Sequence, residues 1–323
     1  MRKVPAWRAP AGRGTWRPAA AVSLLAVAAA LTASGSPASG STATPVPAPR
    51  AVLAAPDAPA ARALPPQAAD RHATPVRAPD PAKAVRGALD ALGPHAGRYT
   101  LAVQDLDTGA RAVYGARTGT YDTASIVKVD ILAALLLRGE RDGAALTAVQ
   151  RQWASAMIRS SDNEATDRLW SVLGGPQALD RANGTLGLGA TTAGGWGTWG
   201  LTQTTAADQL TLLRAVFAED SPLSGESRRY VASLMGAIVP GQDWGVTAAG
   251  PGAPRVLKNG WLMRSRTKLW DVNSIGVVER DGHRLLLSVL TADQPTREDG
   301  IALVEQAASA AVRALVETSP PTA

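Results

Sequence analysis

Ser125-Ile126-Val127-Lys128 is the first of three short elements that decide how this sequence is interpreted. The second is Ser161-Asp162-Asn163, and the third is Lys258-Asn259-Gly260. Together they supply a serine, two lysines, a second hydroxyl and an amide. These are the parts of an active-serine acyl-transfer site in which lysine takes the place that histidine has in other hydrolases. The combination therefore predicts nucleophilic chemistry at the first serine.

Ser125 and Lys128 are three residues apart, so on a helix they lie on one face. Serine is a weak nucleophile until a base removes its proton, and lysine can act as that base when burial or a nearby cation lowers its pKa. Lys258 is a candidate for the cation. Taken alone, Ser-x-x-Lys is common by chance and equally describes a solvated helix face. Only the three elements together predict an active site.

The second and third elements have a functional and a plain structural interpretation. The Ser161 hydroxyl can relay a proton to a leaving nitrogen, and Asn163 can hold a substrate carbonyl. The alternative for this element is a helix cap or a turn. Lys258 on a predicted strand supplies positive charge for a substrate carboxylate, and Gly260 lets a substrate backbone lie close to the strand. The alternative here is an edge-strand lysine followed by a bulge.

Local patterns predict an α+β fold. Asp80-Pro81 marks a helix start, because aspartate caps helices and proline suits the first turn. Asp107-Thr108-Gly109 marks a hairpin turn. The order predicts a three-layer α/β/α arrangement, in which terminal helices pack on an antiparallel sheet and an all-helical subdomain is inserted. The expected elements are helix 81–92, strands 99–104 and 110–115, helix 125–137, helical segments within 145–175, helix 204–216, strands 255–262, 272–279 and 284–291, and helix 301–316.

The three elements, in this order, resemble those of the penicillin-recognising serine enzymes, and most closely those of class A β-lactamases and their relatives. The resemblance covers residues 80–317 and implies a β-lactamase/transpeptidase-like fold. It implies that Ser125 is the nucleophile, Lys128 the acylation base and Ser161 the proton shuttle. It assigns substrate binding to Asn163, Lys258, Asn259, Gly260 and Trp261, with an oxyanion hole formed by the backbone N–H groups of Ser125 and Trp261.

Two departures from the family limit what the resemblance implies. Asn259 replaces a Thr or Ser, and its amide can substitute only in part for the hydroxyl that helps to bind a carboxylate. Class A enzymes also have a Glu-x-x-Leu-Asn element before the next helix, whereas this chain has no Asp or Glu between Arg181 and Ala207. We therefore expect acylation but slow deacylation. Trp196, Trp199 and Trp261 either line the cleft or fill a core.

The expected function is that of a secreted active-serine acyl-hydrolase that forms an acyl-serine with a β-lactam, a D-alanyl-type amide or an ester. The alternative is a binding protein that holds a β-lactam or cell-wall peptide without turnover. Expected partners are therefore small-molecule or peptide substrates, with peptidoglycan as a further candidate. We expect no cofactor and no metal, because the three histidines are scattered singly and no cysteine is present. We also expect a monomer.

The N-terminal region has the pattern of an export signal. Arg2, Lys3, Arg8, Arg13 and Arg17 precede an apolar run over 19–33, which is short for a membrane span. We expect a signal peptide over 1–38, an Ala/Pro-rich linker over 39–79, the enzyme domain over 80–317 and a tail over 318–323. A retained N-terminal anchor is the alternative.

The net charge supports the same division. The formal net charge is +6, and the signal segment alone carries five positive charges, which leaves about +1 for the rest of the chain. The high isoelectric point is thus a property of the signal segment and does not predict nucleic-acid binding.

Overall fold

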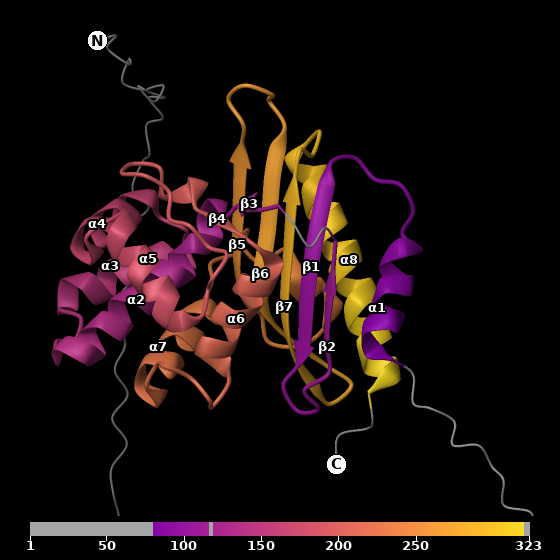
Figure 1. Cartoon of the computed structure of the whole chain (residues 1–323), viewed down its shortest axis with the longest axis horizontal. Helices are drawn as coiled ribbons and strands as arrows, with labels where there is room; N and C mark the ends of the chain where they lie inside the picture. The colour runs from indigo at the N-terminus through magenta and orange to yellow at the C-terminus, as the bar shows by residue number, and fades with distance from the viewer. Residues whose placement is uncertain (1–79, 116–118, 320–323) are drawn as a thin grey trace, which may run out of the picture. The chain divides into compact units, whose positions relative to one another are not determined.

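A five-stranded antiparallel sheet separates two layers of helices (Figure 1). We describe the fold from a computed structural model, which describes residues 80–115 and 119–319. The strand order is β2-β1-β7-β6-β5, and every neighbouring pair is antiparallel. The strands are β1 (Arg98–Asp105), β2 (Arg111–Tyr114), β5 (Val256–Met263), β6 (Trp270–Arg280) and β7 (His283–Ala292).

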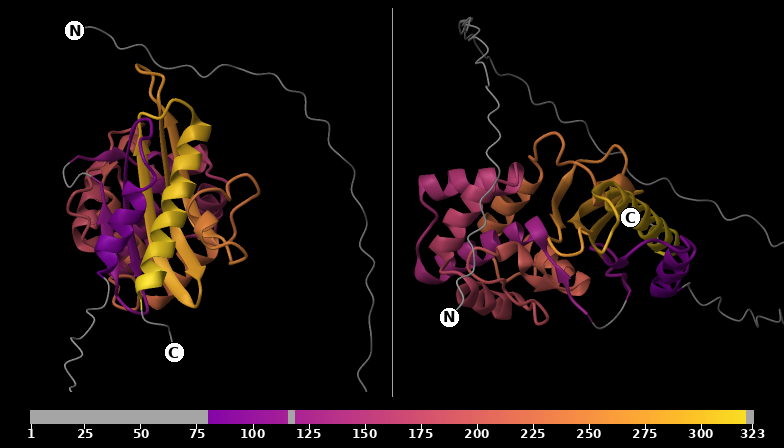
Figure 2. Two further views of the ribbon diagram at one scale, coloured as in Figure 1. Left: turned by 90° about the vertical axis from the view of Figure 1, so that its right-hand side faces the viewer. Right: turned by 90° about the horizontal axis from the view of Figure 1, so that it is seen from above.

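Helices α1 (Pro81–Asp90) and α8 (Arg297–Thr318) lie side by side on one face of the sheet (Figure 2). The first begins as expected, because the Asp80 carboxylate accepts a hydrogen bond of 3.0 Å from the backbone N–H of Ala82. Apolar side chains of both helices and of the facing strands form one core cluster. The predicted closing helix is therefore present, although it begins four residues before residue 301 and reaches Thr318, the first residue of the expected tail.

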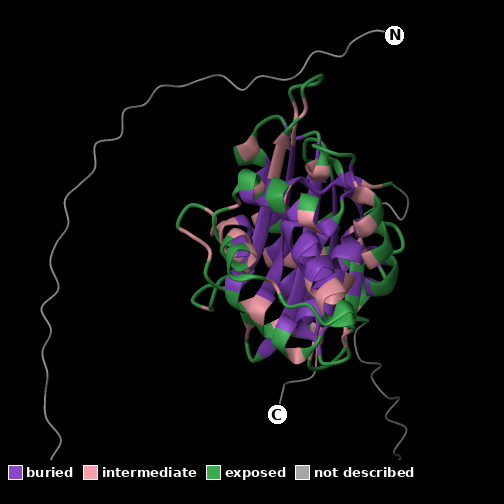
Figure 3. Cartoon of the chain, turned by 90° about the vertical axis from the view of Figure 1, so that its left-hand side faces the viewer, coloured by how far each residue is buried: buried purple, intermediate pink, exposed green. Residues whose placement is uncertain are grey.

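The other face of the sheet carries the inserted helical block. Helix α2 runs through its centre, and its first nine residues, 127–135, are all buried. Exposed residues gather on the outer turns and loops, while the interior is buried (Figure 3). The helices of this block are α2 (Val127–Asp142), α3 (Ala148–Arg159), α4 (Asn163–Leu173), α5 (Pro176–Leu186), α6 (Ala206–Phe217) and α7 (Gly225–Met235).

Helices α5 and α7 were not predicted from the sequence. Helix α5 contains Asn183-Gly184, and α7 begins with mostly polar residues, so local propensity is weak in both. Their buried positions pack against the helical core, which supplies the stability that short helices lack in isolation.

A buried carboxyl links α2 to α5. Asp130 is almost completely buried, and its two carboxyl oxygens accept hydrogen bonds of 2.9 and 3.2 Å from the side-chain amide of Asn183, which is itself buried. Burial raises the pKa of Asp130 to about 8, although the Asn183 hydrogen bond opposes the shift. This carboxyl is therefore mainly protonated at neutral pH.

The expected α+β, three-layer fold is confirmed by this arrangement. The segments expected as signal peptide and linker, 1–38 and 39–79, lie outside the described residues. All described residues belong to one compact unit, Arg71–Ala323. Within that described part, no helix is long and apolar enough to cross a membrane.

Candidate active site

Ser125 lies in a short 3₁₀ turn, η1 (Ala124–Ile126), that leads directly into α2. The sheet holds this turn from one side, because the Asn273 side chain on β6 donates hydrogen bonds to the carbonyls of Asp122 at 2.8 Å and Thr123 at 3.1 Å. From the other side, the backbone N–H of Thr123 donates to the carbonyl of Thr202 at 2.9 Å. The turn that contains Ser125 is thus held by the sheet on one side and by Thr202 on the other.

Strand β3 (Tyr121–Asp122), just before this turn, pairs with β4 (Gln203–Thr204). This pairing places the loop that leads into β4 beside the turn that contains Ser125. The Asp122 carboxylate is buried and forms an ion pair with Arg264, which also pairs with Asp271 at 2.9 Å. Sequence reasoning singled out neither Asp122 nor Arg264. Both hold the turn that contains Ser125 in place and do not contact Ser125 in any described hydrogen bond.

Strand β5 lies directly against the turn that contains Ser125, and the closest approach is at Gly260. A Cβ atom at this position would lie 2.6 Å from the backbone nitrogen of Ser125 and 2.8 Å from that of Ile126. Only glycine permits this approach without displacement of the backbone. The predicted glycine therefore brings the strand, and with it Trp261, next to the backbone N–H of Ser125.

Lys128 is completely buried, and its ammonium nitrogen lies at the centre of the site. Its Nζ atom is 3.0 Å from Ser125 Oγ, 2.8 Å from Asn163 Oδ1, 2.8 Å from the Ser161 carbonyl oxygen and 3.0 Å from Ser161 Oγ. The helical spacing from Ser125 thus gives the predicted contact. The carbonyl and the amide oxygen can only accept hydrogen bonds, so a neutral lysine donates to them and keeps a lone pair for the serine proton.

Lys258 reaches the same group of side chains from β5. Its Nζ atom donates to Ser161 Oγ at 3.1 Å and to the carbonyl of Asn259 at 2.7 Å. Ser161 itself has a φ of 57°, which is uncommon for a residue other than glycine. The structure therefore brings together five predicted residues, which we call the serine–lysine cluster: Ser125, Lys128, Ser161, Asn163 and Lys258.

Burial changes the acidity of both lysines. The pKa of Lys128 falls to about 7 because burial disfavours its charged form, while the charges of Asp162 and Asp167 act in the opposite direction. Burial, together with the neighbouring Lys128, also lowers the pKa of Lys258 well below its usual value. A large fraction of Lys128 is therefore neutral near pH 7, as a general base requires.

Asn259 is not part of the cluster. Its amide nitrogen donates to the carbonyls of Gln242 at 2.9 Å and Trp244 at 2.7 Å, so both of its N–H groups are used within the fold. The side chain is buried. The expectation that this amide replaces a hydroxyl toward a substrate carboxylate has no support in this geometry, because strand alternation directs Asn259 away from the face that Lys258 and Gly260 present.

The loop over residues 194–202, which we call the glycine–tryptophan loop, reaches the cluster at Lys128. The Trp199 ring lies with its centre 4.9 Å from Lys128 Nζ, in cation–π geometry. Its indole N–H donates to Asp167 Oδ1 at 2.8 Å. Asp167 was missed in the sequence, although its position four residues after Asn163 on α4 places both on one helix face.

The two other tryptophans singled out from the sequence have different surroundings. Trp196 is exposed and packs edge-on against Trp170, with 6.4 Å between ring centres. Trp261 is half-buried and lies 5.8 Å from the ring of Trp244 and 5.6 Å from the guanidinium carbon of Arg297. Of the three, Trp199 is the one for which a contact with the serine–lysine cluster is established.

The described residues contain no group of three or more His, Cys, Asp or Glu side chains suited to a metal ion. The reactive groups that the site brings together are one serine, two lysines with lowered pKa values, a second serine and an amide. This set fits acyl transfer through a serine ester.

Comparison with known protein families agrees with this geometry. A sequence model of the beta-lactamase enzyme family matches residues 137–315, more than half of the chain. The chain belongs to the beta-lactamase enzyme family. The matched range begins after Ser125 and Lys128, so the roles of these two residues are argued from the contacts above. A comparison with curated protein sequences gives no match.

Solved β-lactamase structures share the fold. A class A β-lactamase representative from Bacteroides cellulosilyticus has 16% identity, covers 74% of this chain and 99% of its own, and superposes with a TM-score of 0.64. A β-lactamase from Xanthomonas campestris has 21% identity, with coverages of 73% and 99% and a TM-score of 0.60. The protein named PBP-A has 21% identity, with coverages of 73% and 96% and a TM-score of 0.61. At these identities the likeness shows the fold alone.

Family and fold together support a serine hydrolase of the β-lactamase type. The family implies a small-molecule β-lactam as the substrate class.

Proposed function

We propose that this protein is an extracytoplasmic active-serine hydrolase that forms an acyl-serine at Ser125 with a β-lactam, a D-alanyl-type amide or an ester, and that it releases the acyl group slowly. The observation that carries the proposal is the contact of 3.0 Å between Lys128 Nζ and Ser125 Oγ, with a lysine whose pKa is about 7. A buried neutral lysine at this distance can take the serine proton.

Acylation uses groups that are all in place. Lys128 accepts the proton of Ser125 as Oγ attacks the substrate carbonyl carbon, and the negative charge that develops on the carbonyl oxygen faces the backbone N–H groups of Ser125 and Trp261. The bond to the leaving nitrogen or oxygen then breaks. Ser161 gives its proton to the leaving atom and is reprotonated by the lysines that hydrogen-bond to it. The product is a serine ester.

Deacylation needs an activated water, and two features of the site support a slow hydrolysis of the serine ester. The glycine–tryptophan loop has no carboxylate in its sequence, and an indole ring lies over Lys128. General-base assistance contributes about 10²–10⁴-fold to a rate. Without it, the serine ester accumulates.

The same observation favours a second candidate, a protein that is acylated by a β-lactam or merely holds it without turnover. Intact mass after incubation with a penicillin tests the main proposal, with an expected mass increase equal to the bound acyl group. Steady-state turnover of a chromogenic cephalosporin then separates the two candidates. Turnover above the buffer rate supports a slow hydrolase, whereas a stable adduct without turnover supports the binding protein. Absence of any adduct, together with absence of turnover, contradicts acylation of Ser125 by a β-lactam and leaves only the protein that holds a β-lactam without reaction.

Export is the part of the proposal that concerns residues 1–38. The basic start and the short apolar run support a signal peptide that is removed, which leaves the hydrolase outside the cytoplasm. N-terminal sequencing of the protein from culture medium is expected to begin between about residues 34 and 49. A chain in the membrane fraction that still begins at Met1 would instead support the retained anchor.

A further inference from the structure

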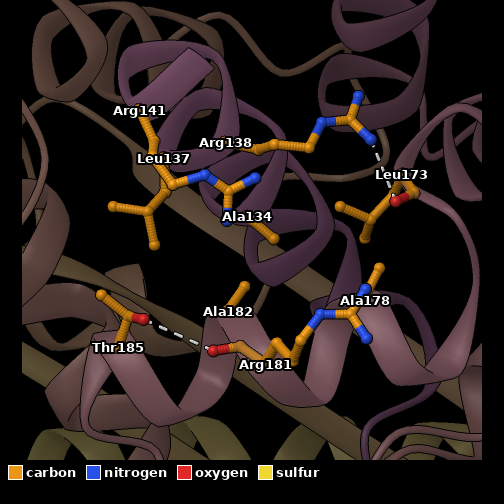
Figure 4. A pocket seen from close by; sticks show the side chains of 9 residues that line it. All are labelled: Ala134, Leu137, Arg138, Arg141, Leu173, Ala178, Arg181, Ala182 and Thr185. Carbon is orange, nitrogen blue, oxygen red and sulfur yellow. Dashed lines mark hydrogen bonds between the residues drawn. The ribbon is translucent and has the colours of Figure 1, made fainter.

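A pocket of about 310 Å³ opens between α2, α5 and the C-terminal end of α4. It is lined by Ala134, Leu137, Arg138, Arg141, Leu173, Ala178, Arg181, Ala182 and Thr185 (Figure 4). The α2 side chains that line it begin at Ala134, six residues after Lys128, which is about 9 Å along the helix axis. The pocket therefore shares a helix with the serine–lysine cluster but none of its side chains.

Three guanidinium groups surround this pocket, and no acidic side chain lines it. Arg138 is fixed in place, because its Nη1 atom donates to the carbonyls of Val172 at 2.8 Å and Leu173 at 3.0 Å. Arg141 pairs with the adjacent Asp142 at 2.8 Å but remains largely exposed. Within the described ranges, the Arg181 guanidinium has neither a hydrogen bond nor an ion pair. Its five donors are thus free for a ligand.

The walls between the arginines are apolar. Alanines at 134, 178 and 182 leave the space open, and Leu137 and Leu173 complete the lining. Arg138 and Arg141 come from α2 along one side of the opening, and Arg181 comes from α5 along the other (Figure 4). An inorganic anion would satisfy the arginines but leave the apolar walls in water. A neutral apolar ligand would fill the walls but make no use of the exposed Arg181 guanidinium, which water would continue to hydrate.

We propose that this arginine pocket, made by Arg138, Arg141, Arg181 and the apolar side chains between them, binds an organic carboxylate with a compact apolar body. The carboxylate pairs with Arg181 in the bidentate geometry that guanidinium groups favour. The apolar body lies against the alanine and leucine side chains. The volume lies at the lower end of the range for small-molecule sites, which suits a ligand of one or two rings.

The test uses the full-length protein and isothermal titration calorimetry with naphthalene-2-carboxylate. Its neutral twin, 2-naphthalenemethanol, has the same rings without the charge. We expect one binding site for the acid and at least about tenfold weaker binding of the alcohol, because the charge-assisted hydrogen bonds are lost. Arg181→Ala is expected to weaken the acid about tenfold, and Arg181→Lys less, since it keeps the charge but not the fork.

Two further variants separate charge from shape. Ala182→Leu fills the pocket and is expected to abolish binding with all three arginines retained. Arg313→Ala, on an exposed position of α8 on the other side of the sheet, is the matched control and is expected to change nothing. Thermal unfolding of each variant checks that the fold is retained.

Equal affinity for acid and alcohol would overturn the proposal, as would unchanged binding by Arg181→Ala or Ala182→Leu. Loss of binding in Lys258→Ala but not in Arg181→Ala would mean that the carboxylate enters the catalytic cleft, and this result also overturns it. The proposed hydrolase activity does not enter this readout, so each proposal can fail while the other holds.

Discussion

Two regions face the same nitrogen atom, Lys128 Nζ, and they differ in kind. On one side, the rest of the serine–lysine cluster places four oxygen atoms within 3.0 Å of it. On the other side, the glycine–tryptophan loop offers an aromatic ring at 4.9 Å. In the proposed reaction, formation of a serine ester uses the first region, while its hydrolysis also needs a base on the second. The contrast indicates that the two halves of one reaction cycle can be built to different degrees.

The largest expected effect removes the nucleophile. Ser125→Ala should abolish covalent labelling by a fluorescent penicillin, because no ester can form without Oγ. Labelling is read on a denaturing gel, and circular dichroism checks that the variant is folded. Full labelling of this variant would remove the catalytic assignment and with it the comparison of the two regions.

Lys128→Ala should slow acylation by about three orders of magnitude or more, because nucleophile and base act as a unit.

In the wild-type protein, the acylation rate should rise with pH through about 7 and level off above it, since only neutral Lys128 accepts the proton. Asp167→Asn removes a negative charge that raises the pKa of Lys128, so the rising limb should move to lower pH. A flat profile between pH 5 and 9 would show that Lys128 is not the base.

Changes in the glycine–tryptophan loop test the second region directly. Wild-type protein should give a burst of product followed by a slow steady rate. Glutamate placed at Trp196, Thr198 or Trp199 in turn should raise the steady rate at one position, by up to about 10²-fold, with an unchanged burst. Rapid turnover by the wild-type protein without burst or adduct would mean that another group activates water. Asp167 is then the first candidate, and loss of that turnover in Asp167→Asn would identify it.

A smaller effect is expected at β5. Lys258→Ala should reduce the acylation rate of carboxylate-bearing substrates about tenfold more than that of neutral esters, because a carboxylate beside Lys258 favours its charged form. Asn259→Thr should improve acylation by β-lactams only if the hydroxyl escapes the contacts with Gln242 and Trp244 that hold the amide. Equal losses of acylation rate on both substrate classes would mean that Lys258 acts by changing the pKa of Lys128 or by stabilising the fold.

The last expected effect concerns stability instead of rate, and it compares Lys128 with another buried group on α2. The pKa of Asp130 rises from 3.8 to about 8 on folding, so the folded state holds a proton that the unfolded chain loses above pH 4. The free energy of unfolding should therefore decrease from pH 4 to 8, by at most about 1.4 kcal/mol per pH unit, and no further above pH 8. Urea unfolding of Asp130→Asn should show a flatter dependence. If Asp130→Asn leaves the pH dependence of the free energy of unfolding unchanged, groups other than Asp130 cause that dependence.

The sequence predicts those structural features that depend on interactions between residues close together in the chain. The cap at Asp80, the hairpin turn at 107–109 and the contact between Ser125 and Lys128 all depend on residues within four positions of each other. The contact of Lys258 with Ser161 joins residues 97 positions apart, and only the resemblance to a family predicts it. The pair formed by Asp167 and Trp199 follows from neither source, because the path of the loop depends on packing. The direction of Asn259 could have been inferred from strand alternation beside Lys258 and Gly260.

The burial of Asn183 has a consequence for how the protein is produced. Asn183-Gly184-Thr185 matches the sequon for N-linked glycans, yet in the fold this side chain is 1% exposed and bound to Asp130. A sugar chain cannot be accommodated at a buried position between two helices. In a host that glycosylates exported proteins, a sugar could be added only before α5 packs, and such a chain could not then complete the helical block. A glycan at Asn183 would therefore identify molecules that were glycosylated before they folded. Thr185→Ala removes the sequon, so glycosylation could no longer precede folding at this site.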